Sequence, residues 1–165
     1  MMGHIEDRLT HLGLELPPEI RLPHGVVLPF AFVNVRGDRA IVSGHGPQLA
    51  DGSLAPPFGQ VEREVSLEQA IHSARLTALS MLGSLQRELG TLDRITGWQR
   101  VFGMVNSVPG FDRQPAVING FSDLILDAFG PEVGRHARSA VGVASLPFGI
   151  PVEVEAEVSI GSASS

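Results

Sequence analysis

The sequence predicts an α+β domain in which a single mixed β-sheet carries two helices on one face. Three observations lead to this fold class. Two long stretches place apolar residues at helical spacing between start and stop signals. Five other stretches are rich in β-branched residues or alternate in polarity, and the order along the chain is β-β-α-β-α-β-β. With 165 residues, the chain has the length of one domain.

The two helices are marked by their ends. The first begins at Ser66, which forms a capping box with the glutamine three residues later, and it ends at Gly90. The second begins at Asp112 or Gln114 and is stopped by the Gly-Pro pair at 130–131. Both helices carry broad apolar stripes that can cover one sheet face. We therefore expect the other face to expose apolar side chains in a monomer, which an oligomer would bury.

Five β-strands are expected from the remaining pattern. The first two form a hairpin around the turn at 36–38, and the last two are joined by a short connection. Prolines interrupt the segment before residue 26, so we assign residues 1–25 to an N-terminal extension and residues 26–165 to one domain. The expected strands are 26–35, 39–43, 95–108, 139–145 and 152–160.

Composition limits the function classes. The chain has 12 basic residues, all arginine, against 18 acidic ones, and the net charge of −6 disfavours a nucleic-acid partner. Cysteine is absent and no apolar run has the length of a membrane span, so we expect no thiolate zinc site, no membrane partner and a cytoplasmic location. The histidines lack metal-ligand spacing and no nucleotide-binding motif occurs, so neither a metal nor a cofactor is predicted. Only 18% of residues are charged, which favours a subunit interface.

Two stretches near the C-terminus carry a family resemblance. They read Arg-Ser-Ala-Val-Gly-Val-Ala-Ser-Leu-Pro at 138–147 and Val-Glu-Val-Glu-Ala at 152–156. Together they resemble the closing signature of the RidA family, also called YjgF or endoribonuclease L-PSP. The residues Val-Ser-Gly at 42–44 are similar to that family's strand-two motif, and Ala-Val-Ile-Asn at 116–119 to its second-helix motif. The resemblance extends over about residues 26–160.

The resemblance implies a chorismate-mutase-like fold and a homotrimer whose sheets form a central barrel, with pockets at the clefts between subunits. The implied activity is hydrolysis of reactive imines and enamines, such as 2-aminoacrylate, to a 2-oxo acid and ammonia. The implied ligand is thus a small carboxylate-bearing metabolite. By position, Arg138 binds the substrate carboxylate, and Glu153 handles water or a proton. Ser43, Gly44 and Asn119 line the pocket.

Three positions depart from the family pattern. Phe30 stands where many members have a pocket tyrosine, His45 replaces a glutamine, and Gly142 replaces a glutamate. Phe30 is therefore expected to line the pocket without a phenolic hydrogen bond. His45 could contact substrate from its glycine-rich loop, or could be a loop histidine without a role. These changes leave Arg138 and Glu153 in place but reshape the pocket.

The chemistry of the two charged residues suits such a reaction. The planar guanidinium of Arg138 can donate two parallel hydrogen bonds to a carboxylate. Glu153, Glu155 and Glu157 share one strand face, and their repulsion together with burial should raise a carboxylate pKa towards general-base behaviour. If the last two strands form a hairpin, Arg138 pairs near Ser159, roughly 20 Å along the strand from Glu153. A shared site would then need the glutamate of another chain.

Three functions stay open at this point. The first is hydrolytic deamination of small imino or enamino acids, and the second is a trimer that binds a small anion such as a keto acid without turnover. The third is the endoribonuclease activity of the family name, which the acidic charge disfavours. Each site residue also has a structural alternative: a surface ion pair for Arg138, a solvated face for Glu153, a helix cap for Asn119 and a turn for Ser43.

Overall fold

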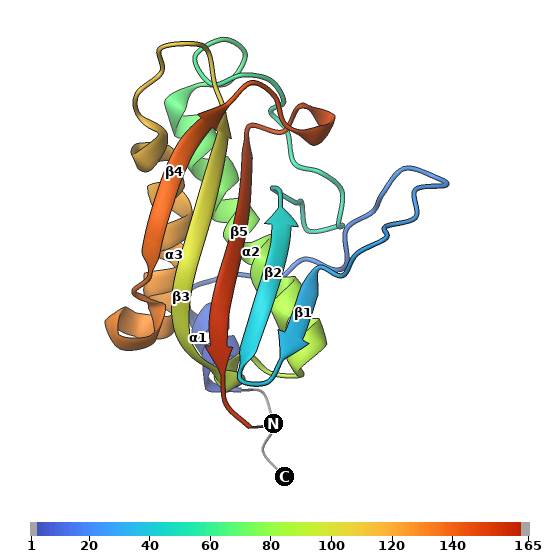
Figure 1. Cartoon of the computed structure of the whole chain (residues 1–165), viewed down its shortest axis with the longest axis vertical. Helices are drawn as coiled ribbons and strands as arrows, with labels where there is room; N and C mark the ends of the chain where they lie inside the picture. The colour runs from blue at the N-terminus through green and yellow to red at the C-terminus, as the bar shows by residue number, and fades with distance from the viewer. Residues whose placement is uncertain (1–2, 163–165) are drawn as a thin grey trace.

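The structure is a computed structural model that describes residues 3–162, and it has the α+β architecture that the sequence predicts (Figure 1). One sheet has the strand order β1-β2-β5-β3-β4, in which β3 and β4 pair in parallel and the other neighbours pair antiparallel. The two long helices cover one face of this sheet. The elements are α1 (His4–His11), β1 (Val33–Arg36), β2 (Arg39–His45), α2 (Leu67–Leu89), η1 (Leu92–Arg94), β3 (Ile95–Asn106), α3 (Gln114–Gly134), β4 (Ala137–Val143), η2 (Pro147–Gly149) and β5 (Val152–Ile160).

Local signals set the ends of both long helices. At the start of α2, the Gln69 amide donates to Ser66 Oγ at 3.1 Å and the Ser66 amide donates to Gln69 Oε1 at 2.9 Å, so the capping box is confirmed. Gly90 follows this helix with a φ of 83°, which glycine adopts without steric cost. Helix α3 begins at Gln114 and is interrupted at Gly130, whose φ is 74°. The predicted stop therefore ends the regular part of α3.

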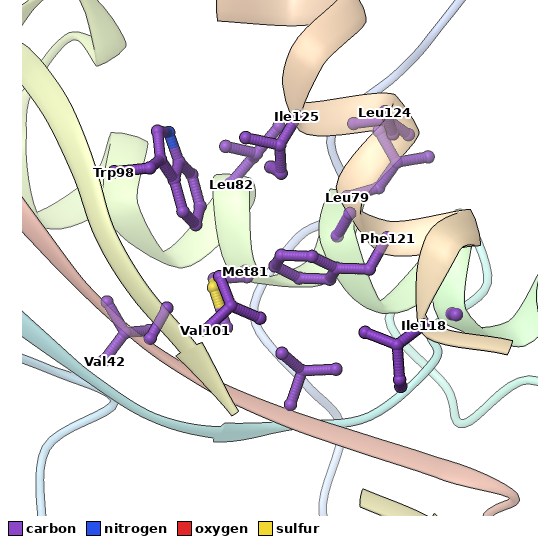
Figure 2. Packing of buried hydrophobic residues seen from close by; sticks show 14 of the residues in the cluster. Val42, Leu79, Met81, Leu82, Trp98, Val101, Ile118, Phe121, Leu124 and Ile125 are labelled. Atoms are coloured by element: carbon purple, nitrogen blue, oxygen red, sulfur yellow. The ribbon is translucent and has the colours of Figure 1, made fainter. Parts of the chain in front are cut away.

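The hydrophobic core lies between the helices and the sheet (Figure 2). Trp98 of β3 stands in an aromatic cluster, with its ring centroid 6.0 Å from that of Phe121 and 5.7 Å from that of Phe129, both on α3. Burying side chains of this size contributes about 1.5–3 kcal/mol each. The labelled core side chains in Figure 2 are Val42, Leu79, Met81, Leu82, Trp98, Val101, Ile118, Phe121, Leu124 and Ile125.

The sheet face opposite the helices is more polar than expected. The valines of the central strand β5 are buried under the helices, whereas Glu153, Glu155 and Glu157 lie on the open face. Phe102 of β3 lies directly opposite Glu155, and Arg39 of β2 pairs with Glu157 at 2.9 Å. The prediction of an apolar open face is therefore wrong for β5, because its alternate residues are glutamates, but it holds on β2 and β4, where Ile41 (48% exposed) and Val141 (36% exposed) lie on this face. We call Glu153, Glu155 and Glu157 the acidic row.

Two strand predictions are wrong. Residues 26–32 form no strand and β1 begins only at Val33, because this segment contains Pro29 and leaves the edge of the sheet (Figure 1). The last two strands do not form a hairpin, since β3 lies between β4 and β5. Arg138 consequently lies opposite Val101 of β3 instead of opposite a residue of β5.

The residues assigned to an N-terminal extension contact the rest of the chain. Leu9 of α1 is buried in the core, and the backbone N–H of Leu92 donates to Oε1 of Glu6 at 2.7 Å. This hydrogen bond ties α1 to the turn between α2 and β3. Within residues 3–162, none of the helices has an apolar stretch of the length that a bilayer span requires.

Candidate functional site

A pocket with a volume of about 220 Å³ lies at one end of the acidic row, where the loop before β1 meets the connection between β4 and β5. Its one charged lining side chain is Glu153, and we call it the Glu153 pocket. The lining combines one carboxylate with a largely apolar wall, which is common in small-molecule sites. The remaining lining residues are Ile20, Leu22, Leu28, Phe30, Phe32, Gly44, Gly46, Leu54, Pro147, Phe148 and Ile150.

The carboxylate of Glu153 is held close to the backbone of β2. A Cβ atom at position 44 would lie 2.9 Å from Cδ of Glu153, so a larger residue here would force the carboxylate to move from its observed position. Burial raises the pKa of Glu153, and the negative charge of Glu155 raises it further. Neither of the two ion pairs found within residues 3–162 involves Glu153. The carboxylate is thus both more basic than usual and not neutralised by a cation of this part of the chain.

Ser43 holds the end of the loop that carries Phe30, but Ser43 itself does not line the Glu153 pocket. The Ser43 hydroxyl donates to the carbonyl of Ala31 at 2.7 Å, which fixes the end of the loop. Phe30 lines the pocket and is 53% exposed, and its ring contacts Phe32 edge to face at 5.7 Å. Phe30, Gly44 and Glu153 therefore come together, whereas the Ser43 proton is engaged with the backbone.

His45 points away from the Glu153 pocket and into the helix layer. Its Nδ1 lies 2.6 Å from the carbonyl of Ser43, so this nitrogen carries the proton, and Nε2 accepts from the hydroxyl of Ser84 on α2 at 2.9 Å. Arg87 in turn donates to Ser84 Oγ at 3.0 Å. Burial lowers the pKa of His45 to about 4, and the charge of Arg87 acts in the same direction. His45 is therefore neutral at pH 7, and it does not line the pocket itself, although its ring lies 5.1 Å from that of the lining residue Phe32.

Arg138 lies on the helix side of β4. Its guanidinium donates to Ser122 Oγ at 3.0 Å and to the carbonyl of Pro115 at 3.2 Å, both on α3. His136 repeats the arrangement of His45: Nδ1 donates to the carbonyl two residues earlier, and Nε2 accepts from Ser122. Pro115, Asn119 and Ser122 are spaced as neighbours on one helix face, which brings the exposed Asn119 beside Arg138.

The residues expected to form one site thus lie in two separate regions of the fold, one around Glu153 and one around Arg138. Arg138 lies opposite Val101, which lies opposite Ala156, and Glu153 is three residues further along β5, or roughly 10 Å. This offset along the strands is half of the roughly 20 Å expected from a hairpin, but β3 lies between β4 and β5, which adds roughly 10 Å across the sheet. The two side chains nevertheless lie on opposite sides of the sheet, because Arg138 contacts α3 and Glu153 belongs to the open face. Within one chain they form no common site.

The sequence analysis missed several residues around both places. Ile20, Leu22 and Phe148 line the Glu153 pocket, and Ser122 holds Arg138. One signal could have indicated part of this lining. Residues 16–29 contain several apolar residues between prolines, whereas a segment exposed to solvent is usually poor in apolar residues. Nothing local in the sequence marks Ser122, because its role depends on the packing of α3 against β4.

Comparisons with known proteins place the chain in a family. Residues 6–152 match the model of the YjgF/chorismate mutase-like endoribonuclease family. The protein TCP17 of Trypanosoma cruzi is 39% identical over 160 residues, which cover 97% of this chain and 96% of that protein. The crystal structure of Atu1372 from Agrobacterium tumefaciens is 39% identical, with a TM-score of 0.82 over 94% of this chain and 91% of the other.

A more distant structural relative carries the family name that the closing motif predicts. RidA from an Antarctic Psychrobacter has 18% identity and a TM-score of 0.56 over 87% of this chain and 94% of the other, so the two share their fold. The family model spans most of the described residues, including β1 to β4 and the start of β5. The chain therefore belongs to the YjgF/chorismate mutase-like endoribonuclease family, as the motif at its C-terminus predicts.

Proposed function

We propose that this protein is a hydrolytic deaminase of reactive 2-imino and enamino acids, working in clefts shared by neighbouring copies of a cytoplasmic homotrimer. The observation that carries the proposal is Glu153, a half-buried carboxylate with a raised pKa that lines a largely apolar pocket. Such a group suits the one difficult task of the reaction, which is moving a proton between water and nitrogen.

The reaction needs few protein groups. An enamine such as 2-aminoacrylate first becomes the imine, as C3 gains a proton and nitrogen loses one. Water then adds to C2 of the imine, so a C–O bond forms while the second C=N electron pair moves to nitrogen. Glu153 accepts the proton of the attacking water and delivers it to that nitrogen. The resulting carbinolamine loses ammonia as its hydroxyl proton moves to nitrogen and the C=O bond of the 2-oxo acid forms. Glu153 ends each turnover in the state in which it began.

Arg138 is the group best suited to hold the substrate carboxylate. Among the described residues its hydrogen bonds go to two acceptors, Ser122 and Pro115, neither of which is charged, and the nearest carboxylate that acts on it, Asp123, forms no ion pair with it. A guanidinium has five N–H donors, so donors remain for a bidentate contact with a carboxylate. Asn119 can add an amide donor on the same helix face.

A second copy of the chain would complete the site. Since Arg138 and Glu153 diverge within one chain, a closed ring in which each copy offers Arg138 to its neighbour's Glu153 pocket would place both groups at every cleft. Burial of the open face, including Phe102, would accompany such a ring. Sedimentation equilibrium should then give about three times the chain mass of 17.5 kDa. A monomer at micromolar concentration would rule out the shared cleft.

The activity is tested with 2-aminoacrylate produced in place by a serine-consuming lyase. We expect the wild type to accelerate its hydrolysis, and Arg138→Ala and Glu153→Gln each to lower kcat/KM at least about 100-fold. Arg135→Ala is the matched control, because Arg135 is an exposed arginine just before β4. Equal rates with and without the wild-type protein would reject the deaminase.

Binding without turnover is the second candidate, and one observation favours it. The Ser43 hydroxyl is engaged with the Ala31 carbonyl and His45 faces the helices, so Glu153 is left without a polar partner in its pocket. In that case calorimetry would detect 2-oxo acid binding that Arg138→Ala abolishes, with no hydrolysis. The endoribonuclease activity in the family description is disfavoured by the net charge of −6 and would require RNA cleavage that Arg138→Ala removes.

A further inference from the structure

We propose that the chain has a second ligand site, separate from Arg138 and Glu153, which binds a small organic molecule with one carboxylate and an apolar body. The site is a pocket of about 430 Å³ at the end of the sheet where the parallel strands β3 and β4 both finish. We call it the Ser107 pocket. The inference goes beyond the proposed deaminase function and does not depend on it, because no residue of the proposed active site lines this pocket.

Four segments far apart in the sequence meet in the Ser107 pocket. Gln60 comes from the loop before α2, residues 107–111 connect β3 to α3, Gln114 begins α3, and residues 142–144 lie at the end of β4 and just beyond it. At the upper end of Figure 1, the loop after β3 and the loop before α2 lie beside the end of β4. A volume of about 430 Å³ is within the range of sites for small organic molecules.

The Ser107 hydroxyl is the observation that points to a ligand. Ser107 is only 8% exposed, yet its Oγ has no hydrogen-bond partner among residues 3–162. A Cβ atom at Gly142 would lie 3.1 Å from this Oγ and 3.0 Å from Nε2 of Gln114, so both polar atoms face the open space beside Gly142. Buried polar groups in folded proteins nearly always have a hydrogen-bond partner. For Ser107, a molecule in the pocket can supply that partner.

The first turn of α3 adds hydrogen-bond donors and positive potential to the same wall. Gln114, the first residue of this helix, lines the pocket, and the side chain of the N-cap residue Arg113 makes no capping hydrogen bond. The first N–H groups of a helix have no acceptor within the helix, and the aligned peptide dipoles place about half a positive charge there. Nε2 of Gln114 donates to the Phe111 carbonyl at 2.7 Å and keeps its second N–H. These groups suit an anion.

The charges around the pocket favour an anion with a single charge. Among the described residues that line it, none is charged, so no carboxylate of the wall repels an anion and no cation of the wall neutralises one. Arg113, which lies beside the lining residues Phe111 and Gln114, is already paired with Glu62. A phosphate monoester carries nearly two charges at pH 7, and arginine or lysine usually binds it. Uncharged donors at one helix end therefore match a carboxylate better.

The rest of the pocket is apolar and fixed in place. Val108, Pro109 and Val143 supply aliphatic side chains to the wall. The Val61 amide donates to the Asn106 carbonyl at 2.8 Å, and the Val108 amide donates to the Val61 carbonyl at 3.2 Å. The loop before α2 is thus tied to the end of β3. A preformed pocket with a few polar donors and an apolar wall fits a carboxylate that carries an apolar body.

Calorimetry on the full chain tests the site with benzoate as the probe. The titrations use the Arg138→Ala background, in which the anchor of the proposed active site cannot hold a carboxylate. We expect one benzoate to bind per chain, and benzamide, which has a similar shape but no charge, to bind at least about tenfold more weakly. No benzoate binding at concentrations up to about 10 mM would overturn the inference. Tighter binding of phenyl phosphate than of benzoate would also overturn it.

Two substitutions in the same background locate the bound benzoate. Ser107→Ala removes the hydroxyl, and because this hydroxyl has no partner among residues 3–162, urea denaturation should show no loss of stability. Gly142→Ala adds a methyl group 3.1 Å from the Ser107 hydroxyl. We expect each substitution to weaken benzoate binding at least about tenfold. Unchanged benzoate affinity in both variants would exclude the Ser107 pocket as the site.

Ser145→Ala is the matched control. Ser145 is an exposed serine next to residues 142–144, but it does not line the pocket. Its substitution should change the affinity for benzoate less than about twofold, because no hydrogen bond to the ligand is removed. A loss as large as that in Ser107→Ala would show that the effect is not specific to the pocket and would overturn the inference.

The second site and the proposed function can fail separately. Benzoate that binds the wild type but not Arg138→Ala would assign the carboxylate to the proposed active site and overturn the second site. Benzoate binding that persists in Arg138→Ala and is lost in Ser107→Ala supports the second site, even if the wild type hydrolyses no 2-aminoacrylate. In that case only the deaminase function would be rejected.

Discussion

The buried histidine at the end of β2 makes folding stability depend on pH in a way that one substitution can isolate. His45 is 4% exposed, and its neutral form donates to the Ser43 carbonyl and accepts from Ser84. Protonation would place a second charge beside Arg87 and leave Nε2 donating to a hydroxyl that already accepts from Arg87. The folded chain therefore resists binding this proton, whereas the unfolded chain binds it readily.

The size of the effect follows from the two pKa values. His45 titrates at about 4 in the folded chain and at 6.5 in the reference state, so the unfolded chain binds more protons between these values. Stability is therefore complete above pH 6.5 and falls as the pH drops towards 4. Linkage gives a loss of about 2 kcal/mol between pH 7 and pH 5 from this group alone.

Urea denaturation followed by the fluorescence of Trp98, the only tryptophan, measures this loss, since Trp98 is buried in the core. The comparison is wild type against His45→Gln at one protein concentration, because an oligomer's stability depends on concentration. We expect the wild type to lose about 2 kcal/mol more than the variant between pH 7 and pH 5. Identical pH slopes for the two proteins would show that His45 is not held neutral.

Three further predictions concern the two halves of the proposed site. Ser122→Ala removes an acceptor of Arg138 and should raise KM about tenfold with a smaller change in kcat. Ser122→Thr keeps the hydroxyl and should retain the wild-type KM. Unchanged kinetics in Ser122→Ala would contradict this positioning role. Gly44→Ala should displace the Glu153 carboxylate and lower kcat at least about tenfold, while urea denaturation shows an unchanged fold. Glu153 must be ionised to act and its pKa is raised. In a plot of kcat/KM against pH, we therefore expect the midpoint of the fall on the acid side to lie above pH 4.5, the ordinary pKa of glutamate, and a midpoint at or below pH 4.5 would exclude Glu153 as the base.

The elements that sequence reasoning located correctly are those whose signals are local. The capping box at Ser66, the left-handed Gly90 and the break at Gly130 each act within one turn of helix, and all three lie where the sequence predicts. The pattern of β5 likewise predicts one face of glutamates, because side chains alternate along any strand. The closing motif identified the family, and the family model confirms it.

The sheet order could not be derived from the same signals. The local patterns fit two arrangements equally well: β4 and β5 could pair directly as a hairpin, or β3 could lie between them. Only the observed pairing of β3 with both β4 and β5 distinguishes the two. The beginning of the first strand depends on a partner as well. Residues 26–32 have a β-rich sequence but belong to no strand, and at the end of this segment the Phe32 carbonyl accepts a hydrogen bond from the Ser43 amide of β2. The roles proposed for Arg138 and Glu153 stay predictions that the kinetic experiments test.

His45 shows most clearly what only the tertiary structure decides. Simple alternation along β2 would put Ile41, Ser43 and His45 on one face, with His45 beside the acidic row. The pairing of β2 with β5 is irregular between Val42 and His45, and this bulge turns His45 to the helix side, against Ser84. Sequence by itself determined the two long helices, their ends, the glutamate face and the family, but not the short helix α1. Strand order, the register shift and the apolar wall of the Glu153 pocket required the folded chain, because each depends on contacts between segments far apart in sequence.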